Sequence, residues 1–261
     1  MIPTPPTLPG GAMLSAGCEK CKGAQAFEFD FVFAYQPIVD LATHSIFAHE
    51  ALVRGPNGES AYSVLSQVTD ENRYSFDQAC RVQAIRGAVE LGMKELLSIN
   101  FLPNAVYQPS ACIRRTFEAA RLYQFPIEQI IFEVTEGEKV MNRAHLVNIF
   151  REYRRFGFRT AIDDFGAGYA GLNLLSEYQP DIVKIDMELV RDVDASKPKQ
   201  AIIDGIVSMC AALDVRVLAE GIETTAERDF LHNAGIDLMQ GYLFCKPTFQ
   251  AIGVVDPLSW D

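Results

Sequence analysis

The hydrophobic positions of this chain form short β-rich runs at first and then alternate with helical stretches. Residues 27–40 alternate apolar with polar positions and then run apolar, which predicts a strand entering the core. A second strand is expected at about 45–53, after a turn at 41–44. A link that short fits an antiparallel pair better than a crossover between parallel strands.

From residue 61 onward the pattern becomes helix, strand, helix, strand. The expected helices span about 76–92, 110–122, 142–156, 172–178, 198–212 and 224–234. Gly92 and Gly157 stand where helix C-caps are expected, and Thr224 to Glu227 resembles a capping box. Repeated strand–helix units with short loops predict a parallel sheet, and their number predicts closure into a TIM-like (β/α)8 barrel. Such barrels need about 250 residues, and the chain has 261.

Six of the predicted strands stop at polar residues, most of them suited to holding a divalent metal. In chain order these residues are Glu50, Asn100, Glu133, Asp163 with Asp164, Lys184 with Asp186, and Glu220. The carboxyl ends of parallel barrel strands all point at one mouth, so the residues are expected to form a ring around a single pocket. Crowded carboxylates repel one another unless cations neutralise them. Their oxygen ligands favour Mg²⁺ or Mn²⁺ over zinc.

The segment Glu50-Ala51-Leu52-Val53-Arg54 carries an acid and a guanidinium on one strand. Glu50 and Leu52 share a strand face, and Arg54 extends that face by two positions. The strand can therefore present a metal ligand and a group that grips phosphate in a bidentate manner. An ordinary salt-bridging pair on a surface strand is the competing interpretation.

The segment Asp163-Asp164-Phe165-Gly166-Ala167-Gly168 is more specific. Two adjacent carboxylates after an apolar strand point in different directions, so they can serve two metals or bridge them. The glycines suit a loop that turns tightly and closes over a substrate. A plain Asp-Gly turn is the alternative, but it leaves the paired acids at the strand end unexplained.

Further residues are expected at the same mouth. Lys184 is suited to hold an attacking water or a phosphate oxygen, although Lys184 and Asp186 alone would fit a structural ion pair. Gln240 is a neutral group able to orient water or a ligand oxygen, and Glu136 is placed to hold the loop after Asp163 by hydrogen bonds.

Composition and charge narrow the function. The formal charge is −11 with no basic stripe, which argues against a nucleic-acid duplex as partner. The charge is compatible with a small phosphorylated ligand, because bound metals reverse the local sign. No apolar run approaches the roughly 18 residues of a membrane span. The chain lacks a Walker loop and a Gly-x-Ser-x-Gly motif, so nucleotide cofactors and serine hydrolysis are disfavoured.

Residues 1–26 are expected to be a flexible leader, and residues 27–261 to be one folded domain. The leader is rich in proline and lacks a basic cluster, so it fits neither a signal nor a transit peptide. Cys18 and Cys21 form a lone C-x-x-C, which disfavours a zinc site within one chain and leaves redox chemistry or a metal shared between chains open. The other four cysteines are expected to be buried thiols, which favours a reducing, cytoplasmic location.

These segments together resemble the EAL-domain family of cyclic-di-GMP phosphodiesterases, over about residues 33–247. The matching pieces are Gln36-Pro37-Ile38, Glu50-Ala51-Leu52-Val53-Arg54, Ile99-Asn100, Phe132-Glu133-Val134-Thr135-Glu136, Asp163-Asp164-Phe165-Gly166-Ala167-Gly168-Tyr169, Val183-Lys184-Ile185-Asp186, Ala219-Glu220-Gly221-Ile222-Glu223-Thr224 and Gln240-Gly241-Tyr242.

The resemblance implies a barrel whose first strand is antiparallel and hydrolysis of cyclic di-GMP to linear pGpG by a homodimer. It implies that two Mg²⁺ or Mn²⁺ ions are held by Glu50, Asn100, Glu133, Asp163, Asp164 and Glu220. It places catalysis on Glu220, Lys184, Asp163, Asp164 and Glu136. It places substrate contacts on Gln36, Leu52, Arg54, Asp186 and Gln240.

Two segments depart from the family pattern. Tyr169-Ala170-Gly171-Leu172 stands where the family usually has two serines, and the stretch between Arg54 and Asn100 is shorter than in many relatives. Neither change removes an expected metal ligand. A receptor that binds cyclic di-GMP without cleaving it is the rival function. Degenerate relatives usually lose the acids that this chain keeps.

Overall fold

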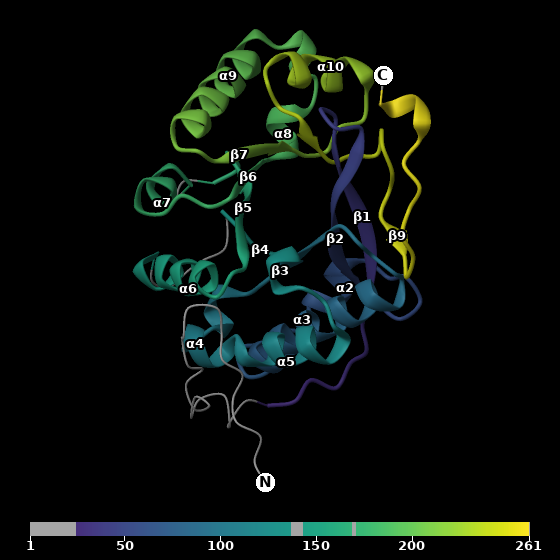
Figure 1. Cartoon of the computed structure of the whole chain (residues 1–261), viewed down its shortest axis with the longest axis vertical. Coiled ribbons are helices and arrows are strands. Elements are labelled where there is room, and N and C mark those ends of the chain that lie inside the picture. The colour runs from purple at the N-terminus through teal and green to yellow at the C-terminus, as the bar shows by residue number, and fades with distance from the viewer. Residues whose placement is uncertain (1–24, 137–142, 169–170, 261) are drawn as a thin grey trace.

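The computed structural model describes residues 25–136, 143–168 and 171–260, and its strands close into a barrel (Figure 1). Strand β1 (Val32–Asp40) pairs antiparallel with β2 (Ser45–Arg54) and with β8 (Leu238–Met239), which confirms the antiparallel first strand. The strands from β2 to β8 pair in parallel and in chain order. The remaining strands are β3 (Leu96–Asn100), β4 (Ile130–Thr135), β5 (Arg159–Phe165), β6 (Ile182–Ile185), β7 (Arg216–Ala219) and β9 (Thr248–Phe249), which adds to the outer edge of β1.

Helices surround this ring of strands (Figure 1). They are α2 (Ala61–Leu65), α3 (Arg73–Glu90), α4 (Pro109–Cys112), α5 (Arg114–Tyr123), α6 (Arg143–Arg155), α7 (Gly171–Glu177), α8 (Met187–Val190), α9 (Lys197–Ala212) and α10 (Thr225–Asn233). Short 3-10 turns lie at Pro103–Ala105, Ile127–Gln129, Val193–Ala195 and Pro257–Ser259. The predicted helices are confirmed, although the one expected at 110–122 is divided into α4 and α5. Sequence patterns did not predict α2 and α8, which are only one turn or so long.

The apolar side chains form two cores because strand residues alternate between the two faces of the sheet. A small core fills the barrel interior; it comprises Ile38, Ala48, Ile131, Ala161, Ile182, Leu218 and Leu238. A larger core lies between the strands and the helices and includes Phe132, Phe150 and Tyr153. Burying an Ile, Leu or Phe side chain of these cores stabilises the fold by about 1.5–3 kcal/mol, so packing on both faces of the sheet supports the strand ends.

The first predicted strand begins later than expected. Residues 27–31 have no strand pairing, and β1 starts at Val32. Phe27, Phe29 and Phe31 instead pack on Phe76 of α3, with ring centroids 6.0, 5.7 and 5.1 Å away. Their alternation therefore reflects packing on a helix rather than pairing with a neighbouring strand.

Helix ends follow their local signals. Thr224 and Glu227 form the predicted capping box at the start of α10, and Gly92 and Gly157 have φ values of 72° and 95°, as C-cap glycines do. Among the described residues, no helix has the length and apolar character needed to cross a bilayer.

The cysteine prediction is confirmed in part. Cys80, Cys112 and Cys210 are buried free thiols, but Cys245 is only half-buried, because it lies in the loop after β8 rather than in a strand. Cys18 and Cys21 lie outside the described residues, as do Tyr169 and Ala170. The division at residue 26 therefore stays a prediction.

Candidate metal centre and active site

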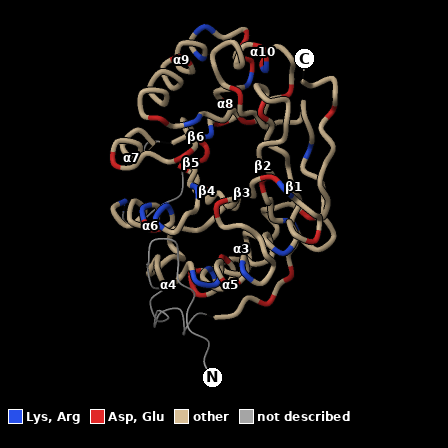
Figure 2. The backbone as a smooth tube through the Cα atoms, viewed as in Figure 1, with Lys and Arg blue, Asp and Glu red and all other residues tan. Residues whose placement is uncertain are grey.

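The strand register brings the predicted acids to one end of the barrel. Asn100 is the ladder partner of Glu133, Thr135 is the partner of Asp163, and Gln36 pairs with Glu50. The strands from β2 to β8 are parallel, so the side chains at their carboxyl ends enter the same mouth, and Gln36 on antiparallel β1 lies beside Glu50 there. Figure 2 shows acidic segments on the ring of strands, whereas basic positions lie mainly on outer helices such as α6 and α9.

Lys184 stands at the centre of the acid ring. Its Nζ lies 2.8 Å from Glu220, 3.0 Å from Glu133, 3.1 Å from Asp163 and 3.5 Å from Glu50, measured to carboxylate oxygens. The residue is fully buried on β6, so none of its charge is screened by bulk water. A buried ammonium needs such partners, and the lysine draws four acids toward one point.

Asp163 and Asp164 both reach this mouth although neighbouring strand residues normally face opposite ways. Asp164 has a left-handed φ of 54°, and the pairing of β5 with β6 is irregular between Ile162 and Phe165. The Asp164 N–H donates to the Asp163 carboxylate at 2.9 Å. This local departure from strand geometry turns the second carboxylate toward Glu220. Backbone strain at such a position is typical of functional sites.

The acids perturb one another strongly. Burial raises the pKa of Glu133 to about 8 against the opposing charge of Lys184, and burial beside Asp163 raises the pKa of Asp164 to about 6. Burial also raises the pKa of Glu220 well above its ordinary value. For Lys184, burial would lower the pKa, but Asp163, Glu133 and the other acids raise it well above the usual value. One ammonium is therefore too little positive charge for this ring.

Neutral side chains complete the first ring of contacts. Asn100 Nδ2 donates to one Glu50 oxygen at 2.9 Å, and Gln240 Nε2 donates to the other at 3.0 Å. The Oε1 atom of Gln240 is buried without a hydrogen-bond partner among the described residues, so it can accept a hydrogen bond from a ligand or water. Ser98, which was not predicted as a site residue, donates to Glu133. Its i, i+2 spacing from Asn100 on β3 was the available signal.

Glu136 holds the loop that follows Asp163 and Asp164. Its carboxylate accepts from the backbone N–H of Gly171 at 2.6 Å, of Gly166 at 2.8 Å and of Gly168 at 3.3 Å. The Glu136 N–H in turn donates to the Asp163 carbonyl at 2.8 Å. Hydrogen bonds to a charged acceptor are stronger than those between neutral groups, so these three bonds tie the loop to the end of β4.

The predicted substrate contacts divide between two hollows. Gln36, Gln240 and Asp164 line a mouth of about 240 Å³ together with Glu50 and Glu220. Leu52 instead lines an adjacent apolar pocket together with Leu65 and Phe76.

Two more predicted contacts lie at the periphery. Arg54 is half-buried, donates to the Val53 carbonyl at 2.7 Å and is absent from the described lining of both hollows. Asp186 is buried, caps α8 by accepting from Glu188 N–H at 2.9 Å, and helps to raise the pKa of Asp164.

The donor set fits two divalent cations. Oxygens of Glu50, Glu133 and Asp163 lie within 4.8 Å of one another, as do those of Asp163, Asp164 and Glu220. The two triads share Asp163, which is the arrangement that a bridging ligand needs. Five carboxylates against one ammonium leave four negative charges when ionised, and two divalent ions would balance them. All the donors are hard oxygens, as Mg²⁺ and Mn²⁺ prefer.

The chain belongs to the EAL domain family, whose model matches residues 24–247. Its structure is similar to a standalone versatile EAL protein from Vibrio cholerae O395, solved in a form with bound c-di-GMP. The two have 52% sequence identity and a TM-score of 0.88, and the match covers 90% of this chain and 100% of the other. BlrP1 of Klebsiella pneumoniae, solved at pH 9.0 as a manganese/cy-diGMP complex, has 36% identity and a TM-score of 0.81. That match covers 96% of this chain and 59% of BlrP1.

The relatives of this chain include proteins named as enzymes and proteins named as regulators. The cyclic di-GMP phosphodiesterase NbdA of Pseudomonas aeruginosa is 31% identical over 82% of this chain and 28% of NbdA. The blue light- and temperature-regulated antirepressor BluF of Escherichia coli is 36% identical over 84% of this chain and 55% of BluF. The chain thus spans about half the length of BluF and less than a third of NbdA. Because the matches cover only part of each relative, the activity and regulation of the whole relatives bear on this chain only through its proposed function.

Proposed function

We propose that this chain is a metal-dependent phosphodiesterase that hydrolyses one phosphodiester of cyclic di-GMP and releases linear pGpG. The observation that carries the proposal is the ring of five carboxylates around buried Lys184, with donor atoms grouped for two cations. The names of NbdA and of the solved complexes support the substrate class. We further propose that the metals are two Mg²⁺ or Mn²⁺ ions.

Glu50, Asn100, Glu133, Asp163, Asp164 and Glu220 would hold these ions. When bound, such ions supply positive charge to phosphate oxygens and lower the pKa of water. Lys184 Nζ has carboxylates at 2.8 to 3.5 Å and is held without freedom to rotate away, so it would donate to a water poised to attack. Gln240 Oε1 would accept from the same water and fix its orientation. Positioning of this kind carries much of the acceleration in phosphoryl transfer.

The remaining predicted residues would hold the substrate. Gln36 lies at the mouth beside Glu50, and Leu52 offers an apolar surface to a base. Arg54 would swing from the Val53 carbonyl to grip a phosphate, because a guanidinium binds phosphate oxygens in pairs. Asp186 is a buried acceptor close to Asp164 and would receive a donor edge of the ligand.

The experiment compares wild-type protein with Glu50→Gln, which keeps the shape of the side chain and removes one metal ligand charge. Glu90→Gln, an exposed substitution at the end of α3, is the matched control. Each protein is incubated with cyclic di-GMP and Mg²⁺ or Mn²⁺, and the products are resolved by chromatography. Equilibrium dialysis measures binding of cyclic di-GMP in parallel, and light scattering tests the homodimer expected from the family.

The outcomes separate the two functions. Production of pGpG by wild type and Glu90→Gln, but not by Glu50→Gln, supports the phosphodiesterase. Uncleaved cyclic di-GMP that binds tightly to all three proteins refutes it in favour of the receptor. BluF, named as an antirepressor, shows that relatives of this chain include regulators, which is why binding is measured beside cleavage. If the wild-type protein neither binds nor cleaves cyclic di-GMP, both functions are refuted.

A further inference from the structure

A second buried ionic cluster lies outside the barrel mouth, between α3 and the strands. Asp77 and Arg81, one turn apart on α3, are 2% and 0% exposed, and their charged atoms are 2.9 Å apart. Arg81 Nη1 also donates to the hydroxyl of Tyr153 on α6 at 2.8 Å. Gln78 Nε2 donates at 3.1 Å to Asp77 Oδ2, the same oxygen that faces Arg81. None of these groups belongs to the proposed chemistry.

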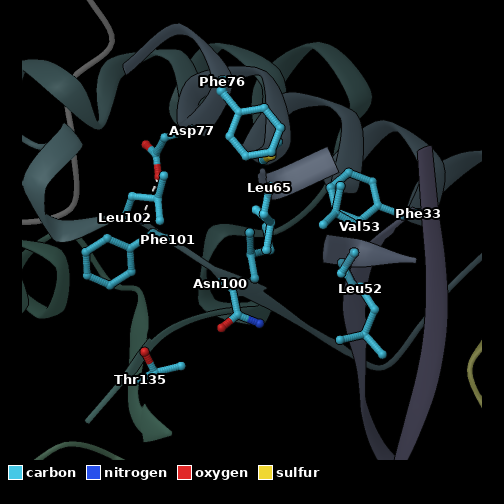
Figure 3. A pocket seen from close by; sticks show the side chains of 14 residues that line it. Phe33, Leu52, Val53, Leu65, Phe76, Asp77, Asn100, Phe101, Leu102 and Thr135 are labelled. Atoms are coloured by element: carbon cyan, nitrogen blue, oxygen red, sulfur yellow. Dashed lines mark hydrogen bonds between the residues drawn. The ribbon is translucent and has the colours of Figure 1, made fainter. Parts of the chain in front are cut away.

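The cluster is tied to the segment that leaves β3. Asp77 Oδ1 accepts from the backbone N–H of Leu102 at 2.9 Å, two residues after Asn100 (Figure 3). Between Asn100 and Leu102, the Phe101 N–H donates to the Glu133 carbonyl at 3.0 Å. The backbone directly after Asn100 is therefore fixed at two successive residues, first by β4 and then by α3.

Arg81 also contacts the aromatic side chains next to the expected ligands on β3 and β4. Its guanidinium carbon lies 4.9 Å from the ring centroid of Phe132 and 5.6 Å from that of Phe101. These rings directly neighbour two expected metal ligands, since Phe132 precedes Glu133 and Phe101 follows Asn100. The cluster therefore supports the backbone beneath both ligands by cation–π contact.

A pocket lies beside this segment. An apolar pocket of about 310 Å³ lies between α2, α3 and the ends of β2 and β3, and it is lined by Leu52, Leu65, Phe76, Asn100 and Leu102 among others. Figure 3 shows Asp77 and Phe76 on one side of this pocket and Asn100 at another. Phe101 packs on Phe132 and Phe150, whereas Asn100 and Leu102 face the pocket, so the Asp77–Leu102 bond adds a polar tie to the packing of Phe101.

Burying an ion pair is a costly way to stabilise a fold, since apolar residues of similar volume often do as well or better. A charged acceptor does, however, fix the position of one backbone N–H better than an apolar contact. We infer that Asp77, braced by Arg81, is a positioning residue that sets Asn100 for metal binding in the proposed phosphodiesterase. The inference rests on that proposed function, because Asn100 is taken as a metal ligand.

The test measures Mn²⁺ binding to the full chain without substrate, from the electron paramagnetic resonance signal of free Mn²⁺. Asp77→Asn keeps the shape but replaces a charged acceptor by a neutral one, and Asp77→Ala removes the acceptor. Asp181→Asn and Asp181→Ala are matched controls. Asp181 also accepts a backbone N–H, from Thr160 at 2.8 Å. This contact lies where β5 and β6 begin, at the end of the barrel opposite the mouth.

We expect Asp77→Ala to weaken Mn²⁺ binding about 10- to 100-fold, as loss of a group that orients metal ligands commonly does. Asp77→Asn should weaken it several-fold, and the Asp181 variants should stay within about two-fold of wild type. Cyclic di-GMP cleavage by the Asp77 variants should return at high Mn²⁺, with kcat near wild type. A merely structural loss would lower activity equally at every Mn²⁺ concentration.

Wild-type Mn²⁺ affinity in a folded Asp77→Ala protein overturns the inference while leaving the proposed function intact. If that variant does not fold, wild-type affinity in Asp77→Asn overturns it equally. An equal loss of affinity in the Asp181 variants also overturns it, because the effect would then be general. A wild-type chain that neither binds Mn²⁺ nor cleaves cyclic di-GMP refutes the proposed function first, and this inference with it.

Discussion

Replacing Lys184 by methionine tests the view that the lysine substitutes for cationic charge when metal is absent. The substitution keeps the length of the side chain and removes an ammonium that has four carboxylates within 3.5 Å. Removing one partner of a buried ionic group costs about 3–5 kcal/mol. For a domain of this size each kcal/mol shifts Tm by about 2–4 °C, so metal-free Lys184→Met should melt roughly 6–20 °C below wild type.

Added Mn²⁺ should reverse much of this loss, because the cations neutralise the same acids. The gain in Tm on adding saturating Mn²⁺ is therefore expected to be larger in Lys184→Met than in wild type. Cleavage of cyclic di-GMP should nevertheless remain about 100- to 1,000-fold slower, since the group that orients the attacking water is gone.

The assay is thermal unfolding in EDTA and in Mn²⁺, beside product chromatography. Lys94→Met, an exposed substitution at the opposite end of the barrel, is the control for replacing lysine by methionine. A fall of less than about 2 °C in the metal-free Tm, or a Mn²⁺ gain no larger than that of wild type, would refute the reasoning.

Three further predictions concern the mouth. Glu136→Gln weakens the acceptor that three loop N–H groups share. The kcat should therefore fall about tenfold, while the metal-free Tm changes by less than about 3 °C. An unchanged kcat would contradict this prediction. The pKa of Glu133 is raised to about 8 in the folded protein. Its carboxyl group therefore stays protonated in the folded protein at pH values where the unfolded protein has already lost that proton. Metal-free stability should therefore fall as pH rises from 5 to 8, and the Mn²⁺ gain in Tm should grow; the opposite trend in a melting series excludes this origin. Arg54→Lys removes a bidentate phosphate group, so KM should rise about tenfold with kcat within about two-fold, whereas exposed Arg86→Lys should change neither in initial-rate assays.

The proposed enzyme and the rival receptor differ in what they require of the mouth. A receptor needs only the residues that hold the ligand, whereas hydrolysis also needs charge balance and a placed water. This chain keeps every expected metal ligand, with Lys184 beside them and with Gln240 Oε1, which has no hydrogen-bond partner in the described part of the chain. That excess of machinery beyond ligand binding is the physical reason for favouring the enzyme.

The sequence by itself determined the barrel and the positions of its acids. Apolar runs that end in Glu50, Asn100, Glu133 and Glu220 predict strand ends, and parallel strands send such residues to one mouth. The short turn at 41–44 predicted the antiparallel start, and Thr224 with Glu227 predicted a helix boundary. These features are local, because strand period, turn length and capping depend on residues close together in the chain.

Only the tertiary structure decided how the site is held. The left-handed φ of Asp164 depends on how β5 meets β6, and no periodicity encodes that twist. The link from Asp77 to Leu102 joins residues 25 positions apart and depends on where α3 packs. Residues 27–31 show the same limit from the other side, since their strand-like alternation has no pairing partner and packs on Phe76. Periodicity gives the face on which a side chain lies, whereas long-range packing selects its partner.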